Sequence, residues 1–285
     1  MRLCRVQASD GEVFLARLEP DDTVVALLRE PQGPGRDALR EALALELDLA
    51  AAPEADLGGS SPLSQWRLLS PVISPQKVIA VGLNYADHAR ESGLEPPKAP
   101  VIFLKTTNSI IGPDEAIVSD PALSEQVDYE VELAIVIGRR ARNVPLADAF
   151  DYVLGYTLCN DVSARDAQFA DGQWSRAKSF DTFCPLGPWI VTTDEIADIQ
   201  DVGIRARVNG QTVQDGTTKE MIFGVAEVVS YLSRCMTLEP GDVIATGTPP
   251  GVGFARKPPL FLKDGDVVEI EVDGIGVLRN PVTRR

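Results

Sequence analysis

Apolar residues recur along this chain in short runs, and Gly, Pro and Asn separate the runs. Runs of 4–8 residues with such punctuation are typical of β-strands. Asn209-Gly210 and Asp273-Gly274 lie between apolar runs and predict tight hairpin turns. The segments from residue 77 onward that predict strands or hairpins are 77–82, 101–105, 130–138, 152–160, 189–192, 204–214, 242–247 and 267–278.

A helical pattern interrupts these strands at residues 221–236. Its apolar positions, which recur at helical spacing and form one face, are Ile222, Val225, Ala226, Val229, Leu232 and Met236. We therefore expect residues 71–285 to form a mainly β domain with flanking helices, an α+β fold.

The first 70 residues have a pattern of their own. Residues 4–8, 12–18 and 21–28 predict strands, with the turn SDG between the first two. Leucines at i+4 spacing predict an amphipathic helix within residues 35–50, and the Gly-, Pro- and Ser-rich residues 51–62 predict a loop. The chain is expected to consist of a small N-terminal α/β domain, residues 1–70, and a larger domain, residues 71–285.

Acidic residues outnumber basic ones. The 285 residues include 42 Asp and Glu against 27 Lys and Arg, and the formal net charge is -15. Such a charge repels nucleic acids and anionic membrane surfaces, so neither is expected as a partner. The longest apolar runs fall far short of the roughly 20 residues of a membrane span. The N-terminus lacks the apolar region of a secretory signal, so we expect a cytoplasmic protein.

Cysteine and histidine usage narrows the possible chemistry. Cys4, Cys159, Cys184 and Cys235 are far apart and show no CxxC spacing, which favours reduced structural thiols over a zinc cage or a redox motif. His88 is the only histidine, so a metal site with several histidines is excluded. Any mechanism that uses imidazole depends on this residue.

Three acidic residues alternate within VDYEVELAIV, residues 127–136, which predicts the start of a half-buried strand. Because successive side chains of a strand point to opposite faces, Asp128, Glu130 and Glu132 would share one side. Another predicted strand ends just before Asp161. Carboxylate oxygens suit Mg²⁺, Mn²⁺ or Ca²⁺ better than zinc or copper. The alternative is the solvent-facing side of an edge strand, and the acidic face alone does not decide between the two.

Three further segments contain residues that could take part in catalysis or in substrate binding. In GLNYADHARESG, His88 and Glu91 are three residues apart, so one helical turn would let the carboxylate orient the imidazole as a general base; an ordinary surface turn is the alternative. Lys178 lies among apolar and aromatic residues in GQWSRAKSFDTFCPLGPW. It is either a snorkelling surface residue or a cation directed at a substrate carboxylate or enolate.

The segment GDVIATGTPPGVG places Thr246, Gly247 and Thr248 at a strand end. Backbone N–H groups and a hydroxyl there could bind a small anion, and a simple tight turn is the alternative. The segment lacks the lysine of a phosphate-binding P-loop, and no GxGxxG opens a helix, so nucleotide binding is disfavoured.

In their order along the chain, these segments resemble the fumarylacetoacetate hydrolase family from about residue 75 to the C-terminus. The segments that carry the resemblance are GLNYADHARE, FLKTTNSIIGP, VDYEVELAIVIG, CNDVSARDAQ, RAKSFDTFCPLGPWI, VNGQTVQDGTTKEMIF and LEPGDVIATGTPPGVGFARKPP. The resemblance implies a mixed β-roll catalytic domain, commonly dimeric, and longer members carry a small N-terminal domain.

The resemblance also implies roles for individual residues. Glu130, Glu132 and Asp161 match the family's metal-binding carboxylates, which hold Mg²⁺ or Mn²⁺, and Asp128 is left as their neighbour. The other matches are His88 and Glu91, the pair that a mobile lid brings over the metal; Lys178, a lysine near the metal; and Gln168 and Thr248, which contact substrate. Gly247, beside Thr248, is a further candidate for substrate binding.

The resemblance specifies the family more closely than it specifies the reaction. We expect a metal-dependent hydrolase that cleaves a C–C bond of a small 2,4-dioxo acid through an enolate, with His88 activating water. The alternatives are an isomerase or tautomerase, or a decarboxylase, acting on oxaloacetate or a 2-hydroxy-dienoate, since all share that enolate. A noncatalytic metal-stabilised binding protein is a further alternative. Partners are expected to be a 2-oxo acid substrate and a second copy of the chain.

Overall fold

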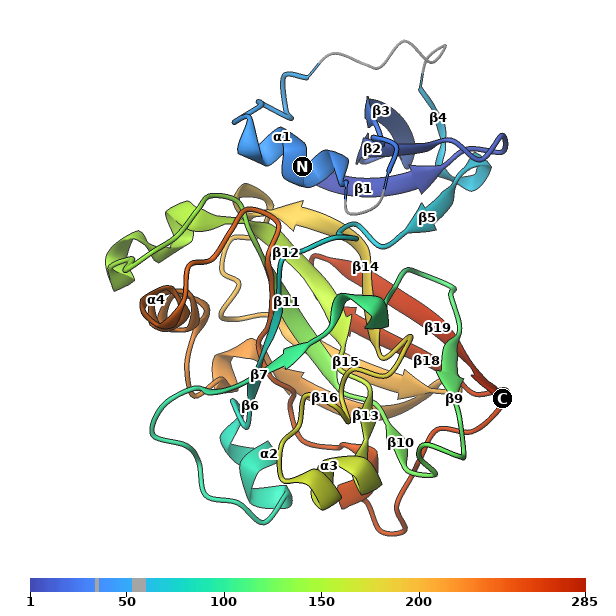
Figure 1. Cartoon of the computed structure of the whole chain (residues 1–285), viewed down its shortest axis with the longest axis vertical. Helices are drawn as coiled ribbons and strands as arrows, with labels where there is room; N and C mark the ends of the chain where they lie inside the picture. Colours follow the sequence, from blue (N-terminus) through green and yellow to red (C-terminus); the bar gives the residue numbers. More distant parts are fainter. Residues whose placement is uncertain (34–35, 53–59) are drawn as a thin grey trace.

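Strands dominate the computed structural model, which describes residues 1–33, 36–52 and 60–285 (Figure 1). The strands are β1 (Arg2–Gln7), β2 (Val13–Leu18), β3 (Thr23–Arg29), β4 (Ser61–Pro62), β5 (Arg67–Leu69), β6 (Val78–Gly82), β7 (Val101–Lys105), β8 (Ile110–Ile111), β9 (Ile117–Ser119), β10 (Val127–Asp128), β11 (Val131–Ile137), β12 (Val153–Asn160), β13 (Ser163–Ala164), β14 (Cys184–Thr192), β15 (Gly203–Val208), β16 (Gln211–Thr217), β17 (Val243–Ala245), β18 (Val267–Val272) and β19 (Gly276–Arg284). The α-helices are α1 (Ala38–Ala44), α2 (Ala86–Glu91), α3 (Arg165–Asp171) and α4 (Val225–Cys235). Short 3₁₀ helices lie at Leu63–Gln65, Thr107–Ser109, Leu146–Tyr152, Thr193–Glu195, Thr218–Glu220 and Gly253–Ala255. The expected mainly β fold with flanking helices is confirmed.

Most of these strands belong to one mixed twelve-stranded sheet. Its order is β4-β3-β2-β1-β14-β12-β11-β17-β6-β7, with β5 paired to β1 and β8 to β14. A second sheet has the order β16-β15-β18-β19-β9, and β10 pairs with β13. Helices α2 and α3 lie at the end of the molecule opposite the N-terminal strands (Figure 1).

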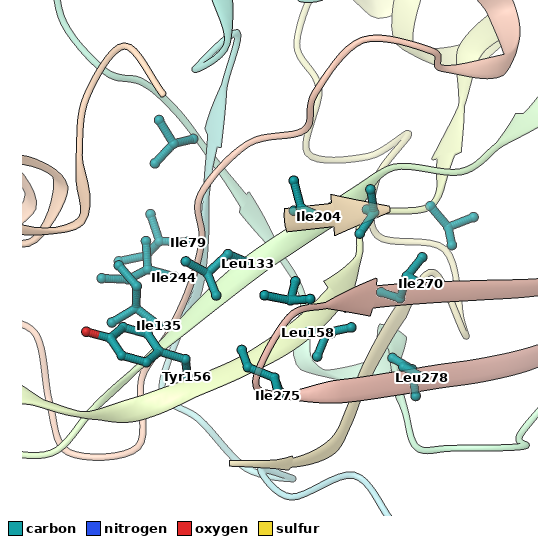
Figure 2. Packing of buried hydrophobic residues seen from close by; sticks show 14 of the residues in the cluster. Ile79, Leu133, Ile135, Tyr156, Leu158, Ile204, Ile244, Ile270, Ile275 and Leu278 are labelled. Atoms are coloured by element: carbon teal, nitrogen blue, oxygen red, sulfur yellow. The ribbon is translucent and has the colours of Figure 1, made fainter. Parts of the chain in front are cut away.

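Strand β11 is buried on both faces, so the expectation of a half-buried strand is wrong. Leu133 and Ile135 point into a core that includes residues of the second sheet (Figure 2). Ala134 and Val136 point to the other face, into a core that includes residues of the N-terminal strands. A strand covered on both faces reads as a continuous apolar run, and Glu132 is an exception to that pattern.

The strand predicted at 130–138 begins at Val131, because the chain leaves the ladder just before it. The N–H of Glu130 donates to Asn160 Oδ1 (3.1 Å), and that of Val131 donates to Gln214 Oε1 (3.0 Å). Side-chain acceptors thus replace strand partners at this point. The interruption separates β10, which carries Asp128, from β11, which carries Glu132.

The helix predicted within residues 35–50 is shorter than expected. It ends at Ala44 because Glu46 adopts a left-handed conformation (φ 53°) and the N–H of Leu47 bonds back to Ala42, as in a Schellman motif. Leu47 therefore lies beyond the helix and is 45 % exposed. Most of the predicted loop at 51–62 falls on residues outside the described ones.

The N-terminal strands continue the main sheet. β1 pairs antiparallel with β14 through Arg2–Val191 and Leu3–Ile190, and β2 and β3 follow beside it. In Figure 1 these strands and α1 form the upper part of the molecule. The division of the chain into residues 1–70 and 71–285 stays a prediction.

Candidate active site

A cavity of about 330 Å³ lies between helices α2 and α3 and the ends of β6, β7 and β11. The predicted site residues that line it are His88, Glu130, Glu132, Gln168, Lys178, Gly247 and Thr248. Glu91 and Asp161 lie behind this wall, where each bonds to a lining residue. The structure therefore brings together residues from α2, β11 and α3 and from four connecting segments, which carry Glu130, Asp161, Lys178, and Gly247 with Thr248.

Three buried carboxylates converge at one end of the cavity. Glu130, Glu132 and Asp161 each offer an oxygen within 4.8 Å of the others. The pairing of β11 with β12 sets this geometry, since Asp161 directly follows β12 and its N–H donates to the carbonyl of Glu130 (2.9 Å). The oxygen donors are of the kind that Mg²⁺ and Mn²⁺ prefer.

Two buried lysines bind this carboxylate cluster. Lys178 Nζ donates to Glu130 Oε2 and to Asp161 Oδ2, both at 2.6 Å. Lys105 Nζ donates to Asp161 Oδ1 (2.6 Å) and to the carbonyl of Lys178. The sequence reasoning did not assign Lys105. In β7, Phe103 and Lys105 are buried and Leu104 between them is exposed, an alternation that the continuous apolar run before Lys105 does not reveal in the sequence.

Among the described residues, the buried acids in and directly beside the carboxylate cluster outnumber the buried bases there by one. Asp128, Glu130, Glu132 and Asp161 are the acids, and Lys105, Arg165 and Lys178 are the bases. Burial alone would raise the pKa of Glu130, but Lys178 and Arg165 beside it hold that pKa below its usual range.

Glu132 is the carboxylate without a cationic partner among the described residues. Burial raises the pKa of Glu132 well above its usual value, and the charges of Asp161 and Glu130 raise it further. Its one hydrogen bond within the described chain comes from the N–H of Gly247 (2.8 Å). A divalent cation among these oxygens would supply the missing positive charge, so the donor set fits such an ion.

His88 and Glu91 form the predicted pair on helix α2. His88 Nδ1 lies 2.9 Å from Glu91 Oε1, and His88 faces the cavity while Glu91 lies behind it. The N–H of Gly251 donates to both oxygens of Glu91, each at 3.0 Å. The carboxylate is therefore fixed from two sides, and it holds the imidazole in one orientation.

Arg165 is a second buried cation that the sequence reasoning missed. Its guanidinium donates to Asp128 Oδ2 (2.8 Å), Glu130 Oε1 (2.7 Å) and Gln168 Oε1 (2.9 Å). Gln168 is thus held by its oxygen, with its amide nitrogen left for the cavity. Asp128 contributes no oxygen to the carboxylate cluster.

Thr248 and Gly247 lie where the loop after β17 meets the cavity. Thr248 Oγ1 accepts from Gln214 Nε2 (2.7 Å), which leaves the hydroxyl hydrogen to be donated to a bound oxygen. The N–H of Gly247 is already donated to Glu132, so it is not free to bind an anion. The substrate-binding roles of both residues stay predictions.

Aromatic residues form the other wall of the cavity. Phe103 packs edge-to-face on Trp174, with ring centroids 5.5 Å apart, and Phe169 packs similarly on Phe254 at 5.4 Å. Trp174 also lies against Gly82, where a Cβ would come within 2.3 Å of the indole ring. One end of the cavity is therefore charged and the other apolar.

Known proteins are similar to this chain in sequence and fold. Residues 77–283 match the family described as fumarylacetoacetate (FAA) hydrolase, C-terminal. A mitochondrial oxaloacetate tautomerase of Xenopus laevis is 44% identical over 290 residues, which cover 99% of this chain and 90% of that protein. The solved 5-carboxymethyl-2-hydroxymuconate delta-isomerase of Mycobacterium smegmatis is 45% identical, with a TM-score of 0.81 and 100% of both chains covered. A fumarylacetoacetate hydrolase from Exiguobacterium antarcticum is 40% identical, with a TM-score of 0.83 and the same coverage.

Across the described residues, no helix is both long and apolar enough to span a membrane. The Xenopus relative is named as mitochondrial, and a cytoplasmic location for this chain stays a prediction.

Proposed function

The chain belongs to the fumarylacetoacetate hydrolase family, and from this premise we propose that it interconverts the keto and enol forms of oxaloacetate with the help of Mg²⁺ or Mn²⁺. The resemblance seen in the motifs is thereby confirmed. It is an enzyme of this family, but its named relatives favour the tautomerase or isomerase alternative over the C–C hydrolase that we placed first. One observation carries the proposal: a histidine held by a carboxylate and a buried carboxylate cluster face each other across one cavity.

The carboxylate cluster would bind the ion and, through it, the substrate. Glu130, Glu132 and Asp161 would hold the cation, which when bound polarises a 2-oxo acid at its C2 carbonyl as a Lewis acid. The hydroxyl of Thr248 and the amide nitrogen of Gln168 would orient the substrate carboxylates. Substrate held in this way would present one C3–H bond roughly perpendicular to the plane of the C2 carbonyl, as enolate formation requires.

His88 is the group that would move the proton. With the Nδ1 hydrogen donated to Glu91, Nε2 is left as the base and can take a proton from C3. Lys178 donates two hydrogens to carboxylates, and its third is available to the C2 oxygen, where negative charge develops. Transfer of the C3 proton to His88 Nε2 and of one proton from Lys178 to the C2 oxygen would give the enol, and the reverse transfers would restore the ketone.

A comparison of two substrates tests this function. Purified protein with Mg²⁺ is added to enol-rich oxaloacetate and, separately, to acetylpyruvate, and proton NMR follows both over time. We expect faster enol-to-keto conversion of oxaloacetate without new products, and no release of acetate from acetylpyruvate. Acetate release with unchanged oxaloacetate exchange would favour the hydrolase instead.

The apolar wall supports a second candidate, an isomerase of longer 2-hydroxy-dienoates. Oxaloacetate is small and charged at both ends, so it would leave the ring surfaces of Phe103 and Trp174 uncovered. The Mycobacterium smegmatis relative carries the name of such an isomerase. Double-bond migration in 5-carboxymethyl-2-hydroxymuconate, followed by ultraviolet absorbance, would support this candidate if it exceeds turnover of oxaloacetate.

Assembly as a homodimer is also a proposal, which analytical ultracentrifugation tests.

A further inference from the structure

Asp128 is fully buried beside the carboxylate cluster, but its bonds lead elsewhere. Oδ1 accepts the N–H of Tyr129 (2.8 Å) and of Gly253 (2.7 Å). Oδ2 accepts the N–H of Phe254 (3.0 Å) and Nε of Arg165 (2.8 Å). Charge-assisted bonds of this kind are stronger than neutral ones. Two of the four donors belong to residues 251–254, which we call the anchor loop.

The anchor loop also holds the catalytic pair. The N–H of Gly251 donates to both oxygens of Glu91, and Glu91 in turn bonds to His88 Nδ1. The loop is thus bound by Glu91 at its first residue and by Asp128 at its last two.

The backbone of the anchor loop packs closely against neighbouring backbone segments. Gly251 has φ 109°, and a Cβ there would lie 2.2 Å from the carbonyl oxygen of Val213. A Cβ at Gly253 would lie 1.9 Å from the carbonyl oxygen of Leu260. A change at one end of so tightly packed a loop is therefore expected to reach the other end.

We propose that Asp128 is a positioning residue that fixes Glu91, and through it His88, by holding the anchor loop. Arg165 extends the same connection to the carboxylate cluster, because it bonds both Asp128 and Glu130. The distance between the base and the carboxylate cluster is then set by Asp128, which faces neither the base nor the substrate. The kinetic consequence rests on the proposed function, since it gives His88 a proton to move.

The single histidine of the chain makes this connection measurable without substrate. In protein labelled with ¹⁵N-histidine, the imidazole nitrogens of His88 are the only histidine ring signals, and their shifts report which nitrogen carries the proton. Asp128→Asn keeps the shape of the side chain but presents an NH₂ group to the N–H donors of the loop. We expect both ¹⁵N shifts to move toward those of Glu91→Gln. Asp201→Asn, an exposed acid paired with Lys219, is the matched control and should leave them unchanged.

Calorimetry and kinetics then separate this role from metal binding. We expect Asp128→Asn to lower kcat about 10-fold or more, because orientation of the base is lost, with the Kd for Mn²⁺ changed less than about 3-fold. The double variant Asp128→Asn, Glu91→Gln should turn over no more slowly than Glu91→Gln alone, since both act on His88 through one connection. Additive losses of kcat in the double variant would overturn the proposal. So would a Kd for Mn²⁺ that rises as much as we expect for Glu132→Gln, which removes a carboxylate of the cluster itself.

A milder variant covers the case in which Asp128→Asn does not fold. Phe254→Leu removes the ring that lies 4.6 Å from the Arg165 guanidinium. We expect this change to loosen the anchor loop while every buried carboxylate stays in place. We expect the His88 shifts to move in the same direction by a smaller amount. A folded Phe254→Leu protein with unchanged His88 signals would refute the connection. Because this spectrum needs no substrate, its outcome stands even if the protein does not act on oxaloacetate.

Discussion

The two ends of the reaction site are built from different kinds of structure. Glu132 lies within β11 of the twelve-stranded sheet, and Glu130 and Asp161 lie at the adjoining ends of β11 and β12, where the N–H of Asp161 donates to the carbonyl of Glu130. His88 and Glu91 lie on α2, a helix of six residues that depends on a side-chain bond to the anchor loop. In the proposed function, cation binding would thus rest on residues of the main sheet, and proton transfer on a short helix that is held by a loop from another part of the chain.

Glu132→Gln should have the largest effect, because it weakens cation binding at the carboxylate cluster. It removes the carboxylate that has no cationic partner within the described chain, so the cation loses a charged ligand. We expect the Kd for Mn²⁺, measured by calorimetry, to rise beyond the roughly 100-fold that loss of an outer partner can cause, with turnover lost as well. Glu46→Gln, an exposed control, should bind Mn²⁺ normally. An unaltered isotherm for Glu132→Gln would place the ion elsewhere.

His88→Ala should remove proton transfer at the other end of the site and leave cation binding intact. Loss of a general base lowers turnover by about 10² to 10⁴-fold. The Kd for Mn²⁺ should stay close to that of the unaltered protein, because the imidazole is not among the carboxylate donors. Steady-state kinetics and calorimetry on the same preparation check both statements. Unchanged turnover would remove His88 from the mechanism.

Lys105→Met tests what holds the carboxylate end together. The substitution leaves Asp161 Oδ1 without its buried cation (2.6 Å), and breaking a buried pair costs about 3–5 kcal/mol of unfolding free energy. Urea unfolding measures this loss. Lys219→Met, at an exposed pair, should change stability by about 1 kcal/mol or less. Equal stability of the two variants would show that the Lys105–Asp161 pair contributes little.

Trp174→Leu should have the smallest effect and acts on the apolar wall. It removes ring surface that oxaloacetate is too small to cover, so KM for oxaloacetate should change little. For 5-carboxymethyl-2-hydroxymuconate we expect kcat/KM to fall by roughly 10-fold, within the range set by changes in an apolar pocket. Equal effects on both substrates would show that the ring serves the site as a whole.

Much of the fold and part of the site follow from the sequence. The alternating apolar runs predicted the strands, and the i,i+3 spacing predicted the contact of His88 with Glu91. The family motifs predicted that Glu130, Glu132 and Asp161 lie together, which their placement within 4.8 Å bears out as geometry. Their role as ligands stays a prediction.

The rest depends on contacts between distant segments. Lys105 ends an apolar run and Arg165 lies in a polar segment. In either setting, a single cation cannot be distinguished from a solvent-exposed one without knowledge of its partner. The strict alternation of the sequence predicted that Asp128 lies on the same side of one strand as Glu130 and Glu132. The interruption before Val131, which directs Asp128 to the anchor loop, arises from bonds to Asn160 and Gln214 that no local pattern encodes.

The most direct test is the dependence of oxaloacetate tautomerisation on the divalent cation. The decay of enol-oxaloacetate is followed by absorbance with protein that has been treated with EDTA and dialysed, and again after Mg²⁺ is restored. We predict that protein without Mg²⁺ leaves the spontaneous rate unchanged, and that restored protein accelerates the decay beyond the rate with Mg²⁺ alone, without forming pyruvate. No acceleration at any Mg²⁺ or Mn²⁺ concentration, or pyruvate formed as fast as the enol decays, would contradict the proposed function.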